Sequence, residues 1–199
     1  IYRNALDPFS AIFDALIHDI SLAEWVEHEK MRQSQKTMQN RLGEFHQAIL
    51  RSLEGWNDLT TGNLVDVVND ERKIIAEIKN KHNTTKGSDK VVVYDNLEFM
   101  LKTKYKGYIA YYVEIIPKNG KTYNLPFCPS DNKKKEKRKA NEKIRQIDGR
   151  SFYDLATGCS GSLRMLYDAL PVVLCDVLQR PTNIETTKLF SELFSVTYK

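Results

Sequence analysis

The sequence predicts an α/β or α+β domain in which helical segments precede and follow a small central sheet. Apolar residues recur at helical spacing before residue 58 and after residue 136, whereas the middle of the chain carries short apolar runs typical of strands. A length of 199 residues suits one compact domain. We expect a single domain with a helical part (1–58), a sheet core (60–127) and a basic segment followed by C-terminal helices (133–199).

The N-terminal part is predicted to form three helices. Asp7 followed by Pro8 is typical of a helix start, and Ser21 with Glu24 has capping-box spacing, which places two helices over roughly residues 8–39. A third helix should follow, because apolar residues recur three or four positions apart along one stripe. The stripe consists of Leu42, Phe45, Ile49, Leu53 and Trp56.

The middle of the chain is predicted to be a sheet. Two short strands are expected over 64–69 and 74–79, and a helix should run from about Lys90 to Lys102. The run GYIAYYVEIIP has the strongest strand pattern, and Asn119-Gly120 behind it predicts a tight hairpin turn into KTYNLPF. The tyrosines of this region are expected in the core and on the sheet, which disfavours a platform for single-stranded nucleic acid.

From residue 136 onward the pattern is predicted to be helical again. Ser151 with Asp154 and Thr182 with Glu185 have capping-box spacing. The stripe of Leu163, Leu166, Leu170, Val173, Leu174 and Val177 is expected to be deeply buried. Residues 133–145 hold eight basic residues against two acidic ones, a density that would attract phosphates, although a solvated loop or helix start explains the run equally simply.

The composition argues against membrane and exported proteins. The mean hydropathy is −0.49, the net charge is +4, and no apolar run approaches the roughly 20 residues of a membrane span. The first residues lack the order of a signal peptide, and because the chain starts at Ile1 it could be a fragment. Three widely separated cysteines predict reduced, buried thiols in a cytoplasm and disfavour a zinc site.

Acidic residues inside the two predicted strands are the strongest functional signal. If 64–69 and 74–79 form a hairpin around residues 70–73, paired positions sum to 143, and Asp66 lies opposite Glu77 on one face. Two carboxylates so close repel each other unless a cation lies between them. Their oxygens suit a hard ion such as Mg²⁺. The pattern therefore predicts a metal site at Asp66 and Glu77.

Lys79 lies two residues beyond Glu77 and shares its face. Its ammonium could hold a phosphate oxygen, position a water molecule or accept a proton from it, so that Asp66, Glu77 and Lys79 together fit phosphodiester hydrolysis. A solvated Glu-Lys pair on an edge strand is the simpler explanation for E-I-K. Against it stand the apolar neighbours of Glu77 and a following loop rich in donors for phosphates and base edges, namely Asn80, Lys81, His82, Asn83, Thr84 and Lys86.

At these residues the chain resembles the PD-(D/E)xK nuclease superfamily. V-D-(x10)-E-I-K matches its metal-site motif at Asp66, Glu77 and Lys79, with Val65 in the place of the proline. More narrowly, AEIKNKHNTT, the preceding GEFHQAILRSLEGW and the later FYDLATG resemble type II restriction endonucleases of the group that cleaves GGNCC. The resemblance covers about residues 40–175. It implies a restriction-endonuclease-like core, a small mixed sheet flanked by helices with N- and C-terminal helical extensions.

The resemblance also implies an activity. The expected reaction is Mg²⁺-dependent hydrolysis of both strands of duplex DNA at a short palindromic, GC-rich site, leaving 5′ phosphates, by a homodimer in the bacterial cytoplasm as part of a restriction-modification system. The carbonyl of Ile78 would join Asp66 and Glu77 as a metal ligand. Neither a nucleotide cofactor nor a membrane partner is implied.

Several residues have weaker claims to a function. Some superfamily members add an acid or amide from a preceding helix, and Glu44 and Gln47 lie in that region, but helical periodicity turns Glu44 toward solvent and places His46 within the apolar stripe. His82 could contact DNA or only cap its loop. Asn83, Lys86 and Arg164 are guesses for residues that read bases.

Two rival functions remain open on the sequence alone. A repair nuclease or junction resolvase could use the same three residues on a branched substrate. A DNA-binding module that never cleaves would need the carboxylates only as a salt-bridged sheet face. RNA is a less favoured partner, because no RNA-recognition module is visible.

Overall fold

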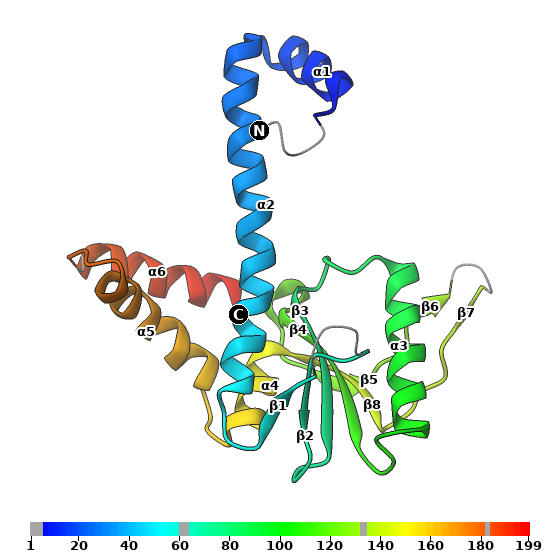
Figure 1. Ribbon diagram of the computed structural model, residues 1–199. Coiled ribbons are helices and arrows are strands. Elements are labelled where there is room, and N and C mark those ends of the chain that lie inside the picture. The colour runs from blue at the N-terminus through cyan, green and yellow to red at the C-terminus, as the bar shows by residue number, and fades with distance from the viewer. Residues whose placement is uncertain (1–5, 60–63, 132–134, 182–183) are drawn as a thin grey trace. The chain divides into compact units, whose positions relative to one another are not determined.

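The computed structural model describes residues 6–59, 64–131, 135–181 and 184–199 (Figure 1). Its helices are α1 (Pro8–His18), α2 (Leu22–Arg51), α3 (Gly87–Lys102), α4 (Gly149–Thr157), α5 (Ser162–Val177) and α6 (Ile184–Thr197), with a 3-10 turn, η1, at Lys118–Gly120. Its strands are β1 (Trp56–Asp58), β2 (Val67–Asn69), β3 (Ile74–Lys81), β4 (Ile109–Ile116), β5 (Asn124–Pro126), β6 (Ser130–Asp131), β7 (Glu136–Lys137) and β8 (Ile144–Asp148). Two compact units, Ile1–Glu44 and Phe45–Lys199, divide the chain inside α2.

A six-stranded mixed sheet in the order β1-β2-β3-β4-β8-β5 forms the centre of the second unit. Strands β3, β4 and β8 are parallel, whereas β1, β2 and β5 join the sheet by antiparallel pairing. The last turns of α2 pack with α4, α5 and α6 on one face, and α3 covers the other (Figure 1). The predicted α/β architecture, a small mixed sheet flanked by helices, is confirmed.

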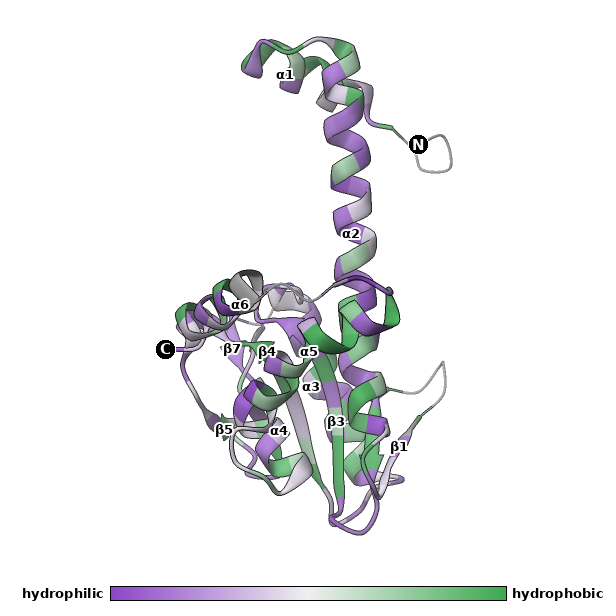
Figure 2. Cartoon of the chain, turned by 90° about the vertical axis from the view of Figure 1, so that its left-hand side faces the viewer, coloured by the Kyte–Doolittle hydropathy of each residue, from purple (hydrophilic) through white to green (hydrophobic). Residues whose placement is uncertain are grey.

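The order β3-α3-β4 determines where the carboxyl ends of the parallel strands lie. Parallel strands need a crossover connection, which α3 provides here, so the carboxyl ends of β3, β4 and β8 meet at one edge of the sheet beside the start of α3. The first residues of β3 are buried on both faces, as expected for an interior strand, and the strand is mainly hydrophobic in Figure 2. Polar residues occur only toward its carboxyl end.

The predicted helix starts are confirmed in the first unit. Asp7 accepts hydrogen bonds from the backbone amides of Phe9 and Ser10, and Ser21 forms the expected reciprocal capping box with Glu24. The prediction of separate second and third helices is wrong, because α2 is continuous from Leu22 to Arg51. No proline interrupts this segment, so nothing forces a break. Trp56 lies beyond the helix in β1.

The predicted hairpin between GYIAYYVEIIP and KTYNLPF is also wrong. β4 forms over Ile109–Ile116 as expected, but its neighbours are β3 and β8, and β5 pairs with β8 instead. The chain leaves β4 through η1, in which Asn119 has a left-handed conformation, and crosses to the far side of β8. A parallel partner buries both faces of β4 more completely than a two-stranded ribbon could.

Residues 136–148, predicted to be helical, form strands β7 and β8 instead. Ile144 and Ile147 point to opposite faces and are fully buried in the two halves of the core, which a central strand requires. Asp148, rather than Ser151, caps α4: its carboxylate accepts the amide and hydroxyl of Ser151. The predicted box at Thr182 begins outside the described residues.

The C-terminal apolar stripe is far less buried than predicted. Leu163 is buried, but Val173, Leu174 and Val177 are 52%, 52% and 71% exposed. Only the first turns of α5 reach the core of this unit, so the rest of the stripe has no core to enter. Of the cysteines, Cys159 is exposed and the other two are partly buried, so the expectation of three core thiols is wrong.

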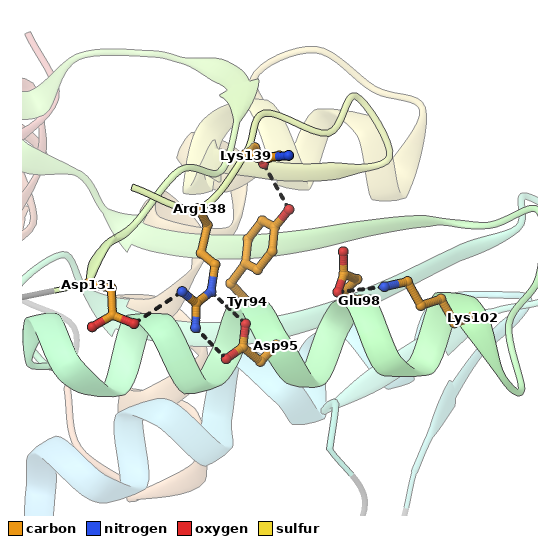
Figure 3. Close-up of polar contacts among 7 residues, drawn as sticks. All are labelled: Tyr94, Asp95, Glu98, Lys102, Asp131, Arg138 and Lys139. Atoms are coloured by element: carbon orange, nitrogen blue, oxygen red, sulfur yellow. Dashed lines mark hydrogen bonds and ion pairs between the residues drawn. The ribbon is translucent and has the colours of Figure 1, made fainter. Parts of the chain in front are cut away.

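The short β6–β7 hairpin is fastened to α3 by one arginine. Arg138 binds both carboxylate oxygens of Asp95 at 2.8 Å and reaches Asp131 at 3.1 Å, and Tyr94 donates its hydroxyl to the carbonyl of Lys139 (Figure 3). Among the described residues of the basic run, Arg138 is thus held in ion pairs with acidic residues of the protein, whereas Lys139 is exposed. No described helix combines the length and apolarity that a membrane span needs.

Candidate active site

The hairpin register predicted from the sequence is confirmed. Val67 pairs with Ala76, Val68 with Ile75, and Asn69 with Ile74, so paired positions sum to 143. The ladder continues one step further, where the amide of Asp66 donates to the carbonyl of Ala76 at 3.0 Å. Val68 and Ile75 lie in the cluster under α3, which places their alternating neighbours Asp66, Glu77 and Lys79 toward that same face.

The structure brings the three predicted catalytic side chains together. Asp66 accepts the backbone N–H of Ile78 through Oδ2 at 2.7 Å, and Nζ of Lys79 lies 2.6 Å from Oε1 of Glu77. The side chain of Glu77 is 15% exposed and that of Lys79 31% exposed. The three groups therefore lie at the carboxyl end of β3, and Lys79 is the more accessible member of the Glu77–Lys79 ion pair.

Burial and charge set the protonation of this group. Burial raises the pKa of Glu77, the negative charge of Asp66 raises it further, and Lys79 opposes both effects. Burial alone would lower the pKa of Lys79, but the carboxylates of Glu77 and Asp66 outweigh it, so the pKa is raised. Lys79 is thus protonated and carries a positive charge. Asp66 and Glu77 have only this one cation beside them, so the two carboxylates still repel each other.

A cavity of about 410 Å³ opens beside Glu77 and Lys79. Its lining comes from the carboxyl end of β3, the loop before α3 and the first turns of α3. The lining residues are Glu77, Lys79, Thr84, Thr85, Asp89, Val92 and Val93. Charged and hydroxyl side chains thus line this cavity beside two valines of α3, a mixed lining that suits a polar or charged ligand.

The donor set fits a magnesium ion. Asp66 and Glu77 offer hard carboxylate oxygens, and the N–H of Ile78 already points toward Asp66, so its carbonyl, which projects from the same edge of the strand, points the same way. Mg²⁺ is commonly held by one or two carboxylates and keeps several waters. Within the described ranges, no cluster of three or more His, Cys, Asp or Glu side chains is placed to hold a metal.

The predicted DNA-contacting loop lies beside the cavity. Asn80 and Lys81 end β3, Thr84 lines the cavity, and Lys86 is the N-cap residue of α3. Lys81, Asn83, Thr84 and Lys86 are exposed. His82 is only partly exposed: its backbone N–H donates to the carbonyl of Ile116, and its buried Nδ1 has no hydrogen-bond partner. These positions suit contacts with a ligand over the cavity.

Glu44, His46 and Arg164 are the weaker candidates. Glu44 is exposed, as helical periodicity indicated. Nδ1 of His46 lies 2.8 Å from the hydroxyl of Tyr153, a residue of the core cluster on the sheet face opposite Glu77. Arg164 binds Asp168 at 2.6 Å and also contacts two serines of α6. His46 and Arg164 therefore have structural partners in this conformation.

His46 allows a test of stability against pH. Burial lowers the pKa of its imidazole from 6.5 to about 4, so the unfolded chain binds a proton at a higher pH than the folded chain. The stabilisation by neutral His46 is complete above pH 6.5 and is lost as the pH falls toward 4. Between about pH 7 and pH 4.5 we expect the wild type to lose about 2 kcal/mol more unfolding free energy than His46→Gln. Urea unfolding measures this difference, and equal losses would contradict it.

A second buried carboxylate near the site was missed in the sequence. Glu114 in β4 is 2% exposed and forms an ion pair with Lys90 of α3, with Nζ–Oε1 at 2.6 Å. Its other oxygen, Oε2, accepts from the hydroxyl of Tyr123 and from Nε2 of Gln146. The signal that revealed Glu77, an acid inside an apolar strand, is equally present in Y-Y-V-E-I-I and could have identified Glu114.

Comparisons with known proteins give one consistent family. The sequence profile described as Eco47II restriction endonuclease matches residues 1–179. The chain is 41% identical to the type II restriction enzyme Eco47II of Escherichia coli over 203 aligned positions, covering 98% of this chain and 84% of that protein. It is 30% identical to the type II restriction enzyme Sau96I of Staphylococcus aureus over 198 positions, covering 97% and 76%. No solved structure matches the chain significantly.

Proposed function

The chain belongs to the Eco47II restriction endonuclease family and is a type II site-specific deoxyribonuclease, and we propose that Asp66, Glu77 and Lys79 carry out its reaction. The observation that supports this assignment is the convergence of the three side chains at the carboxyl end of β3, beside an open cavity. It corresponds to the metal-site motif of the PD-(D/E)xK superfamily. We assign the fold to that superfamily on the same residues.

Each residue has a distinct role in the proposed reaction. Asp66, Glu77 and the carbonyl of Ile78 would hold Mg²⁺, which when bound polarises the scissile phosphate and acidifies a water molecule. Lys79 remains protonated next to its carboxylate partners, so it acts first as an ammonium that orients the attacking water and offsets charge on the phosphate. Hydrolysis at phosphorus with the 3′ oxygen leaving gives 5′-phosphate ends.

The proposed substrate is duplex DNA with a short palindrome of the GGNCC type. Both curated relatives are named type II restriction enzymes, and the motifs quoted from the sequence resemble the group that cleaves this site. Guanine-rich sites are read by bidentate Arg or Lys contacts, each worth about 1 to 3 kcal/mol of discrimination. The exposed loop residues Asn83 and Lys86 are our candidates for contacts with base edges. A homodimer would match the two-fold symmetry of the site.

Fragment-end sequencing tests this function. The protein is incubated with phage DNA and Mg²⁺, with a chelator in a parallel reaction, and the ends of the products are sequenced. Discrete fragments that end at one short palindrome and carry 5′ phosphates support the proposal. A smear, or cleavage that persists in the chelator, would exclude it.

The two rival functions give different results in the same assay. A junction resolvase nicks branched DNA and leaves a linear duplex intact. A module that binds without cleaving produces no new ends, and its Glu77→Ala variant behaves as the wild type in every respect. Membership of a restriction endonuclease family makes both less favoured than sequence-specific cleavage.

A further inference from the structure

Glu114 lies on the strand next to Lys79, directly opposite it. β3 and β4 are parallel, and Lys79 and Glu114 are paired in the register, so both side chains leave the sheet on the face covered by α3. Side chains that face each other across neighbouring strands have Cβ atoms about 5 Å apart. A lysine with such a neighbour can reach its carboxylate, so Lys79 has Glu114 within range on one neighbouring strand in addition to Glu77 on its own strand.

In the structure Lys79 binds only one of them. Its ammonium pairs with Glu77, whereas Oε1 of Glu114 is taken by Lys90 at 2.6 Å. Both donors to Oε2, Tyr123 and Gln146, come from the β8 side of β4, which leaves Oε1 for the β3 side. Lys90 thus occupies the oxygen of Glu114 that Lys79 would otherwise approach.

Lys90 is held firmly in this place. It belongs to the first turns of α3, and its Nζ lies 5.3 Å from the ring centre of Tyr112, which is itself fully buried and stacked on Phe127. Tyr112 and Glu114 are both on β4 and share one face, so ring and carboxylate bind the same ammonium. An ion pair with one partner 97% buried is screened far less than a surface pair.

We propose that Lys90 is a positioning residue that keeps Lys79 available for catalysis by neutralising Glu114. In the proposed reaction Lys79 has to turn from Glu77 toward the water or the phosphate, and at that moment an unpaired Glu114 would compete for its charge. While Lys90 is bound to Glu114, the negative charge of that carboxylate is already balanced by the ammonium of Lys90. The inference rests on the proposed role of Lys79 and adds to it a partner on another strand and another helix.

Removing Lys90 tests the inference. In Lys90→Met we expect the single-turnover cleavage rate to fall about tenfold or more, because Lys79 is drawn to Glu114, while the Kd for the DNA site changes less than about threefold. The same Lys90→Met change made in a Glu114→Gln background should alter the cleavage rate less than about threefold, because the competing charge is gone. A crystal structure of Lys90→Met should show Nζ of Lys79 within about 4 Å of Glu114.

A matched control lies on the same helix. Lys102 forms an ion pair with Glu98 at 2.7 Å on the exposed side of α3 (Figure 3), so Lys102→Met removes a lysine and breaks an ion pair without touching Glu114. We expect wild-type cleavage from it. If Lys90→Met proves too unstable to assay, Lys90→Gln keeps a donor for Glu114 but no charge, and it should show the same loss of rate.

Failure of this inference differs from failure of the proposed function. Wild-type rates in both Lys90 variants, or an equal loss in the presence and absence of Glu114, overturn the inference even if Lys79→Met abolishes cleavage. Undiminished cleavage by Lys79→Met would instead show that the proposed catalytic role of Lys79 is wrong. Melting temperatures of all variants, measured alongside, separate a loss of fold from a loss of rate.

Discussion

Glu77→Gln is expected to lower the single-turnover cleavage rate by on the order of 1,000-fold and to raise the stability of the folded protein at neutral pH. The rate falls because an amide is a much weaker ligand for a hard cation than a carboxylate is. It also falls because Lys79 loses the partner that holds its ammonium over the cavity. DNA binding should persist, since Glu77 is an acid and makes no favourable contact with phosphates by itself.

The gain in stability follows from the pKa of Glu77. Burial and the charge of Asp66 raise that pKa, so the ionised form is less favourable in the folded chain than in the unfolded chain. A carboxyl group with a raised pKa stabilises the fold while it is protonated, and this contribution is lost as the pH rises through the folded-state pKa. Replacing Glu77 with neutral Gln removes the cost at neutral pH, which we expect to be worth about 1 kcal/mol.

Urea unfolding and single-turnover kinetics measure the two effects separately. Glu98→Gln is a suitable control, because Glu98 also pairs with a lysine but lies on the exposed side of α3, and it should change neither quantity. A variant that loses both activity and stability would point to Glu77 as a structural residue. A variant that keeps wild-type cleavage would remove Glu77 from the proposed site.

The sequence was most informative where local rules suffice. The polar tetrapeptide Asp70-Glu71-Arg72-Lys73 separates two short apolar runs, and treating these four residues as the loop gives the observed register, so the approach of Asp66 to Glu77 could be predicted. The same holds for the capping residues Asp7 and Ser21, whose partners are two or three residues away.

The errors arose where the partner of a segment is distant in sequence. β4 has a turn signal behind it, but its neighbour is β8, nearly thirty residues further along, and only the burial of Ile144 and Ile147 in opposite halves of the core explains that choice. Likewise, the apolar stripe of α5 predicts that one face of the helix packs against other apolar residues. It does not say whether the core of this unit supplies those residues. Such information comes from tertiary packing and is absent from local periodicity.

The buried ion pair of Glu114 and Lys90 has one feature that local sequence rules could predict and one that depends on tertiary packing. An acid inside an apolar strand is a local signal, so the residue could have been noticed. Its partner depends on how α3 crosses the sheet, which the sequence did not reveal, and Tyr123 and Gln146 reach it from segments on the other side of β4.

Asp66 should respond differently from Glu77, and the comparison of two substitutions shows why. Its Oδ2 accepts the N–H of Ile78 at 2.7 Å, and Ile78 is 3% exposed, so water cannot easily replace this acceptor. Asp66→Ala leaves a buried amide without a partner and should cost about 1 to 3 kcal/mol of unfolding free energy. Asp66→Asn keeps an acceptor oxygen and removes the repulsion with Glu77, so it should be at least as stable as the wild type.

Both substitutions should nevertheless lower the cleavage rate by on the order of 1,000-fold, because both remove a negatively charged ligand of the proposed metal site. Urea unfolding and single-turnover assays with DNA and Mg²⁺ therefore sort the two roles of Asp66: stability follows the hydrogen bond to Ile78, and rate follows the charge. If Asp66→Asn cleaved at the wild-type rate, Asp66 would only close the end of the β2–β3 ladder, and the metal would have to be held by Glu77 with other oxygens.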